Sequence, residues 1–230
     1  MPKLAAKTAT PRGRFITFEG GEGSGKSTHI KRLAERLRKA KTRTIVTREP
    51  GGSPGAEIIR HVLLSGMGKL LGPEAETLLF AAARDDHVHT VIKPALEQGR
   101  WVLCDRFSDS TRAYQGQLGN VASSLLNAME RVTIGDLKPD LTIILDVPVE
   151  VGMHRAAARR GTGTADRFEA EDFNFHERLR DAYRQIALDE PQRCVLIDAN
   201  ADTDVVAANI WTSVRHRLLP AAMPKTAKLA

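Results

Sequence analysis

The glycine-rich segment from Gly20 to Ser27 has the spacing of a phosphate-binding loop, with two glycines five positions apart followed directly by Lys26 and Ser27. Glycine lets successive backbone N–H groups turn toward a triphosphate, and the helix after such a loop adds the positive end of its dipole. The lysine reaches the β- and γ-phosphates, and the serine hydroxyl binds Mg²⁺. The alternative is a glycine-rich turn that binds nothing. The apolar run at 15–18 and the helical pattern after the loop favour triphosphate binding.

Three arginines, Arg48, Arg84 and Arg106, occur where a second anionic group could be held opposite a triphosphate. A guanidinium binds phosphate through two parallel hydrogen bonds, although an arbitrary arginine more often forms a surface ion pair. Phe80 and Arg84 are four residues apart in a helical pattern, so both project from one helix face. The ring can stack on a base, and the arginine can donate to a pyrimidine 4-oxo group but not to the 4-amino group of cytosine. Taken alone, Phe80 is better explained as a core residue.

Short apolar runs alternate with helical patterns along the chain. The runs are residues 15–18, 42–47, 101–104, 141–146 and 194–197, and the helical patterns cover 26–40, 54–65, 73–98, 109–115, 121–135, 149–160, 172–188 and 202–218. Nearly continuous apolar strands separated by helices are typical of a parallel sheet that is covered on both faces. The sequence therefore predicts an α/β fold of the P-loop NTPase type, with a five-stranded parallel sheet.

Polar residues follow four of these predicted strands. Glu19, Arg48, the pair Asp105 and Arg106, and Asp146 each stand where a strand ends. Each could be a helix cap or a turn residue. In open parallel sheets, however, ligands bind beyond the carboxyl ends of the strands. Their shared position therefore favours an active site at this edge of the sheet.

The net charge of +6 comes from the two ends of the chain. Residues 1–14 carry four basic side chains and residues 220–230 carry two, with no acidic residue in either segment, so residues 15–219 sum to zero. No nucleic-acid-binding face is therefore predicted. We expect disordered tails at 1–13 and 220–230 around a single domain at 14–219.

Membrane and disulfide chemistry are not expected. The chain has no run of 18 apolar residues and no secretory signal pattern. Cys104 and Cys194 each border an apolar strand, which is typical of two buried, reduced thiols in a cytoplasmic protein.

In their order and spacing, a series of sequence blocks resembles the bacterial thymidylate kinases across nearly the whole body of the chain. The blocks are Phe18–Thr28, Thr47–Gly52, Leu79–Arg84, Asp105–Phe107, Ala113–Gly116, Pro139–Thr142, Leu145–Val147 and Arg155–Arg167. The resemblance implies transfer of the γ-phosphoryl group of ATP to dTMP, giving ADP and dTDP for dTTP synthesis. It also implies a cytoplasmic homodimer that uses Mg²⁺.

The same resemblance assigns roles to individual residues. ATP would be bound by Gly20, Gly21, Glu22, Gly23, Ser24, Gly25, Lys26, Ser27 and Thr28, and Mg²⁺ by Ser27 and Asp105. The dTMP site would consist of Phe80 on the thymine, Arg84 on its 4-oxo group, Arg48 and Arg106 on the phosphate, Glu22 on the 3′-hydroxyl, and Ser110, Tyr114 and Gln115 around the sugar and base.

A mobile lid at about 155–168 completes the pattern that the resemblance implies. No strong base is needed, because a phosphate acceptor is already ionised, so catalysis is positioning and charge neutralisation. The phosphate loop itself contains no arginine, whereas the lid carries Arg155, Arg159, Arg160 and Arg167, with Gly161–Thr164 giving it flexibility. The expected catalytic residues are Lys26, Asp105, Arg106, Arg155 and Arg159. A solvated helix face is the alternative for Arg155 and Arg159.

Other functions remain open at this stage. A kinase for UMP, CMP or dUMP is disfavoured by Phe80, Arg84 and Tyr114, and a nucleotide-binding switch is disfavoured by the number of acceptor-side and lid arginines. A nucleic-acid-associated role would rest on the basic tails alone.

Overall fold

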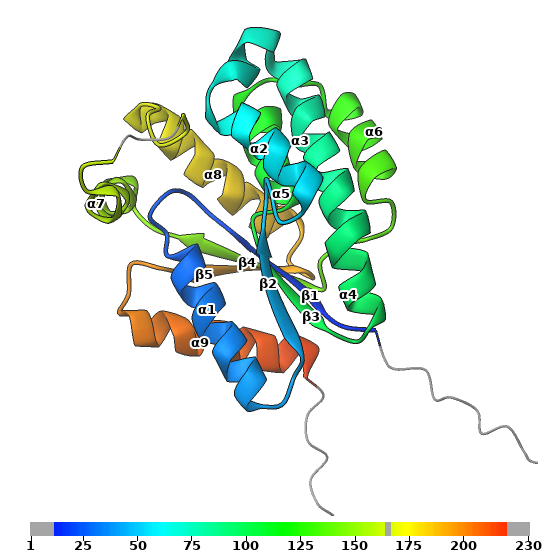
Figure 1. Cartoon of the computed structure of the whole chain (residues 1–230). Coiled ribbons are helices and arrows are strands. Elements are labelled where there is room, and N and C mark those ends of the chain that lie inside the picture. Colours follow the sequence, from blue (N-terminus) through cyan, green and yellow to red (C-terminus); the bar gives the residue numbers. More distant parts are fainter. Residues whose placement is uncertain (1–11, 164–166, 220–230) are drawn as a thin grey trace, which may run out of the picture.

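A five-stranded parallel sheet forms the centre of the molecule, in the order β2-β3-β1-β4-β5 (Figure 1). The computed structural model describes residues 12–163 and 167–219. The strands are β1 (Phe15–Glu19), β2 (Thr44–Arg48), β3 (Trp101–Asp105), β4 (Leu141–Asp146) and β5 (Cys194–Asp198). The chain runs from β1 out to β2, returns to β3 between them, and then continues on the other side of β1. This reversal of strand order creates the crevice in which such sheets bind ligands.

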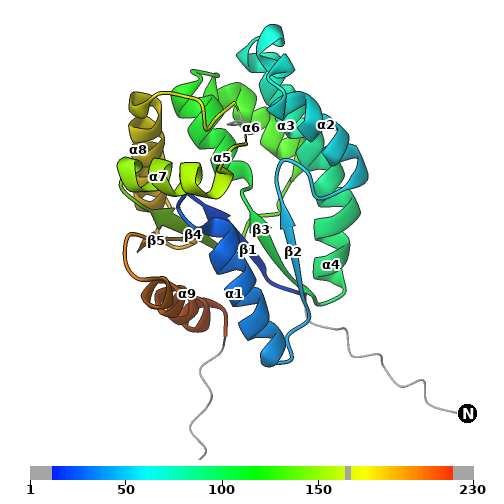
Figure 2. The same cartoon turned by 60° about the vertical axis from the view of Figure 1, so that its left-hand side comes forward.

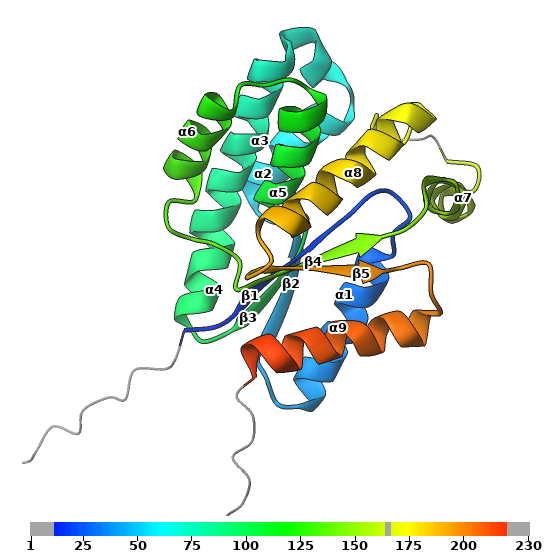
Figure 3. The same cartoon turned by 180° about the vertical axis from the view of Figure 1, so that it is seen from behind.

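Two helices cover one face of the sheet (Figure 3). They are α1 (Lys26–Lys39) and α9 (Thr203–Leu218). Ile30 and Leu37 of α1 and Ile210 of α9 are buried against Ile16 and Ile143 of the sheet. Packing of α1 on the sheet therefore fixes the direction in which this helix leaves the phosphate loop.

The opposite face is covered by α8 (Phe173–Asp189) and by a long helical segment made of α3 (Pro73–His87), η2 (Val88–Ile92) and α4 (Lys93–Glu97). The η2 turn is a π-helix, in which Lys93 N bonds to the Val88 carbonyl. Pro94 has no N–H to donate to the preceding turn, so a wider turn is a reasonable adjustment there. The helix predicted at 73–98 is thus continuous but locally widened.

The remaining helices extend the layer on this second face of the sheet (Figure 2). They are α2 (Pro54–Leu64), η1 (Met67–Leu71), α5 (Ser108–Thr111) with the π-helix η3 (Arg112–Leu118), α6 (Ser123–Thr133) and α7 (Val149–Arg160). Helix α2 packs along α3, and α3 packs along α6. Helix α7 follows β4 and lies beside the phosphate loop.

The predicted fold class is confirmed, with small shifts at the element ends. Strand β2 begins at Thr44 rather than at residue 42, because Lys41 takes a left-handed φ of 61° to end α1 and the chain needs two more residues to turn. Cys104 and Cys194 are free and buried, as predicted. Within the described residues, no helix combines the length and the apolarity that crossing a membrane requires.

The ends of the predicted domain differ slightly from the structure. The sequence predicts a disordered tail through residue 13, whereas Gly13 is buried and its N–H donates to the Leu96 carbonyl. Arg12 pairs with Asp140, which also binds Arg14 and the N–H of Phe15. Residues 1–11 and 220–230, and the lid residues 164–166, lie outside the described part of the chain.

Candidate active site

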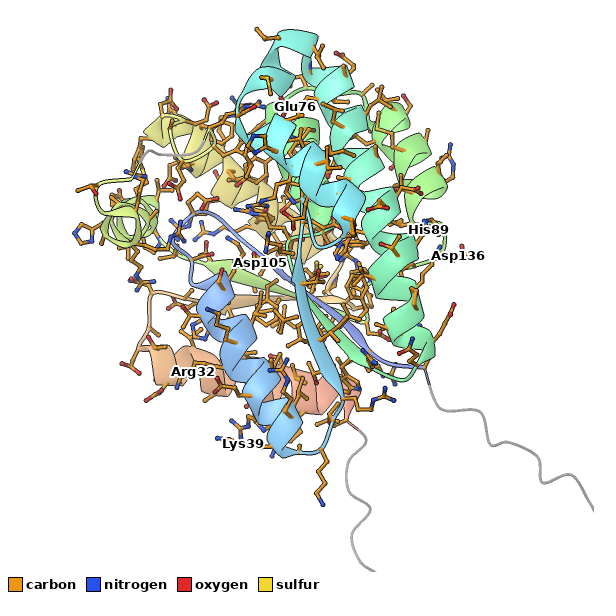
Figure 4. All side chains as sticks on the ribbon, in the orientation of Figure 1. Arg32, Lys39, Glu76, His89, Asp105 and Asp136 are labelled. Carbon is orange, nitrogen blue, oxygen red and sulfur yellow. The ribbon has the colours of Figure 1, made fainter. Side chains whose placement is uncertain are left out.

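A cavity of about 270 Å³ opens beyond the carboxyl ends of β1, β2 and β3. Figure 4 marks one of its residues, Asp105, near the start of α1. Of the residues predicted for the site, those lining the cavity are Glu22, Gly23, Ser24, Gly25, Lys26, Ser27, Thr28, Arg48, Phe80, Arg84, Asp105, Arg106, Ser110, Tyr114, Gln115 and Arg159. The structure thus brings nearly all of the predicted residues to one place.

Among the described residues, several predicted polar or loop positions lie outside the cavity lining. Gly20 and Gly21 line a separate small recess together with Asp146. Asp146 was grouped with the active-site edge by its position after β4, but its carboxylate is taken by Arg180 and Arg184 of α8. This side chain therefore ties α8 to the sheet.

The phosphate loop has the backbone that its glycines predict. Gly20, Gly23 and Gly25 all have positive φ, at 132°, 65° and 88°. At Gly23 the requirement is also one of space, because a Cβ there would lie 1.9 Å from the carbonyl oxygen of Gly152 in α7. Helix α7 is therefore packed directly on the phosphate loop.

Lys26 is folded back onto the loop that carries it. Its Nζ donates to the carbonyl oxygens of Gly20 at 3.0 Å and Gly21 at 2.8 Å. Burial, followed by the charge of Arg106, lowers the pKa of Lys26 to about 8. Phosphate oxygens beside Nζ would favour its charged form and replace these carbonyls as acceptors.

Ser27 and Asp105 meet at the base of the cavity. Ser27 Oγ donates to Asp105 Oδ2 at 2.8 Å. A hydroxyl and a carboxylate that face one cavity are hard oxygen ligands of the kind Mg²⁺ prefers, and Mg²⁺ takes its other ligands from phosphate and water. The residues present therefore fit the ion that the sequence predicts.

Arg106 links the phosphate loop to the acceptor side. Its backbone is left-handed, with a φ of 67°, which turns the side chain into the cavity. The guanidinium donates to the Gly20 carbonyl at 3.1 Å, to Tyr183 Oη at 3.0 Å and to Glu22 Oε1 at 2.5 Å. Burial acts to raise the pKa of Glu22, but the charges of Arg106 and Lys26 outweigh burial and hold that pKa below its usual value.

Glu19 is fully buried behind Arg106 and holds the turn in which Arg106 lies. Its Oε1 accepts the N–H of Phe107 at 2.7 Å, and its Oε2 accepts from Ser110 Oγ at 2.6 Å. Burial, followed by the nearby charge of Asp109, raises the pKa of Glu19 to about 8. This carboxyl group therefore retains its proton at neutral pH in the folded protein.

An aromatic wall borders the far half of the cavity. Phe168 lies between Phe80, at a centroid distance of 6.4 Å, and Tyr114, at 5.1 Å with its ring nearly perpendicular. Arg84 is buried below them and pairs with Glu49 at 2.7 Å. Apolar rings above a set of N–H donors can hold a planar base that presents acceptors.

Arg48 stands at the exposed mouth of the cavity. Its Nη2 donates to Glu57 Oε1 at 2.8 Å. Because the pair is half-exposed, its two partners separate at little free-energy cost. An incoming phosphate can therefore take the place of the carboxylate.

The four lid arginines differ in whether they face the cavity. Arg159 lines the cavity, pairs with Glu169 at 2.6 Å and lies 4.0 Å from Glu22. Arg160 pairs with the same Glu169, and Arg167 turns away to Glu76.

Arg155 was predicted to be catalytic together with Arg159, but it lies outside the cavity lining formed by the described residues. Its guanidinium donates to the Ala199 carbonyl at 2.9 Å, in the loop after β5. Four residues separate the two arginines, so they lie about 6 Å apart along the axis of α7.

Comparison with known proteins agrees with this geometry. A family model described as thymidylate kinase matches residues 18–210. The chain belongs to the thymidylate kinase family. The thymidylate kinase of Nitrobacter winogradskyi is 75% identical over 221 residues, and that of Bradyrhizobium diazoefficiens is 74% identical over 220 residues; each alignment covers 96% of both chains.

A solved structure supports the same assignment. The crystal structure of thymidylate kinase from Ehrlichia chaffeensis is 34% identical to this chain, with a TM-score of 0.72, and the alignment covers 89% of this chain and 100% of that one.

The sequence analysis did not assign a role to several residues at or near the cavity of this member of the thymidylate kinase family. Glu49 was part of a recognised sequence block without a role of its own, and Phe168 was only the last residue of the predicted lid. Tyr183 reads as an ordinary buried residue of α8. The signal for Glu49 was available, because an acidic residue between Arg48 and Pro50 directly after a strand lies at the ligand-binding edge.

The raised pKa of Glu19 predicts a pH-dependent stability. Between its unfolded value, near 4.5, and about 8, the folded state keeps a proton that the unfolded state releases, so the free energy of unfolding falls as the pH rises through this window. Glu19→Gln keeps an acceptor for Phe107 and removes the titration. Relative to the wild-type protein, this variant should therefore gain stability from about pH 5 to about pH 8 in urea unfolding. The exposed Glu35→Gln is the control, and an equal pH response in both variants would contradict the prediction.

Proposed function

We propose that this protein transfers the γ-phosphoryl group of ATP to dTMP, giving ADP and dTDP for dTTP synthesis. Membership of the thymidylate kinase family supports the reaction. The observation that carries the assignment is that one cavity contains both a phosphate loop with Lys26 and a base pocket with Phe80 and Arg84, joined by Arg106. A nucleotide switch would need only the first half.

The donor half binds the triphosphate of ATP. Backbone N–H groups of the loop and the first turn of α1 point toward its phosphates, and Lys26 neutralises the β- and γ-phosphates. The prediction that residues 20–28 bind ATP is supported by the positive φ angles of the loop and by its place beside the cavity. Ser27 and Asp105 would hold Mg²⁺, which draws charge from the transferred group.

The acceptor half orients dTMP for in-line attack. Arg48 and Arg106 would hold its phosphate, Phe80 would stack on the thymine, and Arg84 would donate to the 4-oxo group. Glu22 would bind the 3′-hydroxyl from within the loop, with Ser110, Tyr114 and Gln115 along the sugar and base. Support comes from their shared lining of the cavity. The acceptor oxygen is already ionised, so the protein supplies position and positive charge and no base is required.

The preference among nucleoside monophosphates as acceptors tests this proposal. ADP formation from ATP should be fastest with dTMP when dTMP, dUMP, UMP, CMP and AMP are offered one at a time. CMP should fall behind dTMP by at least about 100-fold in kcat/KM, since its 4-amino group would face the donors of Arg84. Absence of dTMP-dependent turnover would contradict the kinase proposal. Equal turnover of CMP would contradict only the role of Arg84.

We assign the lid cation to Arg159, because it lines the cavity and lies 4.0 Å from Glu22 of the phosphate loop. Arg159→Ala should lower kcat on the order of 1,000-fold with little change in the KM for dTMP, as expected for a cation that stabilises charge in the transition state. Arg160→Ala is the matched control, since Arg160 pairs with the same Glu169. Losses of similar size in both variants would mean that the Glu169 pairs merely hold the lid together.

We further propose that the enzyme works in the cytoplasm as a homodimer. Support for the dimer comes from exposed apolar side chains on helices that pack side by side, namely Ile58 of α2, Leu70 and Leu71 of η1, Leu78 of α3 and Val132 of α6. Two chains that cover such a surface remove it from water. The two free buried thiols agree with a reducing compartment.

Sedimentation equilibrium tests the dimer. The wild-type protein should have about twice the chain mass of 25.2 kDa. Leu78→Glu should shift it toward monomer, because a charge would be buried in an apolar interface. Leu188→Glu, at an exposed position of α8, is the control and should remain dimeric. A wild-type monomer would contradict the proposal.

A further inference from the structure

A chain of buried polar side chains runs behind the base pocket and ends at Arg84. Thr47 Oγ1 lies 2.6 Å from His87 Nε2, and His87 Nδ1 lies 3.0 Å from Glu49 Oε1. Glu49 Oε2 accepts from Arg84 Nε at 2.7 Å. The exposed fraction is 0% for the His87 side chain and 4% for that of Glu49, so these groups are held away from water.

The direction of the bond to Glu49 follows from its chemistry. A carboxylate paired with an arginine only accepts, so His87 carries a proton on Nδ1 and donates it to Glu49. His87 Nε2 shares the other hydrogen bond with the Thr47 hydroxyl. Each oxygen of Glu49 therefore has one partner, Arg84 on Oε2 and His87 on Oε1.

The neighbouring backbone is shaped to leave room for this chain. Gly52 has a φ of 87°, and a Cβ there would lie 2.4 Å from Thr47 Oγ1 and 2.5 Å from His87 Nε2. Residues from β2, from the loop after it and from α3 thus meet at one point. Among the residues that the structure describes, Glu49 and Arg84 line the cavity, whereas Thr47, Gly52 and His87 lie outside its lining.

The donors of Arg84 are divided between the protein and the cavity. Nε donates to Glu49, and Nη2 donates to the Phe107 carbonyl at 3.2 Å and to Thr111 Oγ1 at 3.0 Å. Among the described residues no acceptor is paired with Nη1, and Arg84 lines the cavity. An arginine has five N–H donors, so two of them remain for a ligand.

We propose that His87 is a specificity-determining positioning residue, which occupies one oxygen of Glu49 so that Arg84 keeps its Nη1 donors directed at the base. The proposal rests on the function proposed above. A free carboxylate oxygen beside a guanidinium favours a two-bond, side-on pair through Nε and Nη2. The His87 N–H on Oε1 competes with that pair, and Nη2 instead donates to Phe107 and Thr111.

Loss of His87 would change what the pocket recognises. Oε1 would draw Nη2 away from Phe107 and Thr111 and rotate the guanidinium plane, which moves Nη1. A fixed donor rejects a 4-amino group because two donors then face each other without an acceptor, whereas a mobile donor can avoid that contact. Discrimination between 4-oxo and 4-amino pyrimidines should therefore fall more than binding of ATP.

Two replacements at one position separate positioning from folding. His87→Leu removes the donor and retains much of the volume, whereas His87→Asn can place an N–H near the position of Nδ1. The ratio of kcat/KM for dTMP to that for dCMP should fall about tenfold or more in His87→Leu and recover largely in His87→Asn. The KM for ATP should stay within about twofold in both, because the phosphate loop is untouched.

Thr47→Val covers the case in which His87→Leu does not fold. It leaves His87 in place and removes the hydroxyl that is hydrogen-bonded to His87 Nε2. The ratio for dTMP to dCMP should therefore fall, but by less than in His87→Leu. An unchanged ratio in a folded His87→Leu or Thr47→Val protein would overturn the inference, as would an equal loss for dTMP, dCMP and ATP. Failure of the proposed function is a different result, since the wild-type protein would then show no dTMP turnover at all.

Discussion

The rest of the site depends on the hydrogen bonds that Arg106 makes to the phosphate loop. Its left-handed backbone directs the guanidinium into the cavity, where it bonds both Gly20 and Glu22 of the phosphate loop. A non-glycine residue in this conformation persists only where the surroundings hold it. Here Glu19 does so, by accepting the N–H of Phe107 directly after the turn. The end of β1 thereby fixes the geometry at the end of β3, and the donor and acceptor halves become one site.

The fold could be predicted from the sequence because its signals are local. Buried parallel strands are nearly continuous apolar runs, and the run at 141–146 coincides with β4. The helix-face argument for Phe80 and Arg84 also needed only their spacing, and both line the cavity. Contacts between distant elements carried no such signal. Tyr183 meets Arg106 only because α8 packs over β4, and its place in α8 resembles that of any core residue.

The lid shows where family resemblance alone was too coarse. It pointed to Arg155 and Arg159 equally, since both lie on α7 and carry the same charge. The structure separates them through the packing of Gly152 against Gly23, which sets where α7 crosses the phosphate loop. That crossing places Arg159 on the cavity side and leaves Arg155 beside the loop after β5. A sequence gives the helix, but the crossing point depends on a contact across 129 residues.

Four arginines of the cavity are each paired with an acidic residue, namely Arg48, Arg84, Arg106 and Arg159. The pairs differ in whether an arriving substrate can replace the acidic partner. The half-exposed pair of Arg48 with Glu57 can open at little cost, so phosphate can replace the carboxylate. Arg159 is likewise exposed and held by Glu169. The pair of Arg84 with Glu49 is buried, and breaking it would leave an uncompensated charge away from water. Under the proposed function, exposed arginines can therefore exchange partners as phosphate arrives. Arg84 would instead recognise the base without moving, which would explain why a buried histidine occupies the second oxygen of its carboxylate.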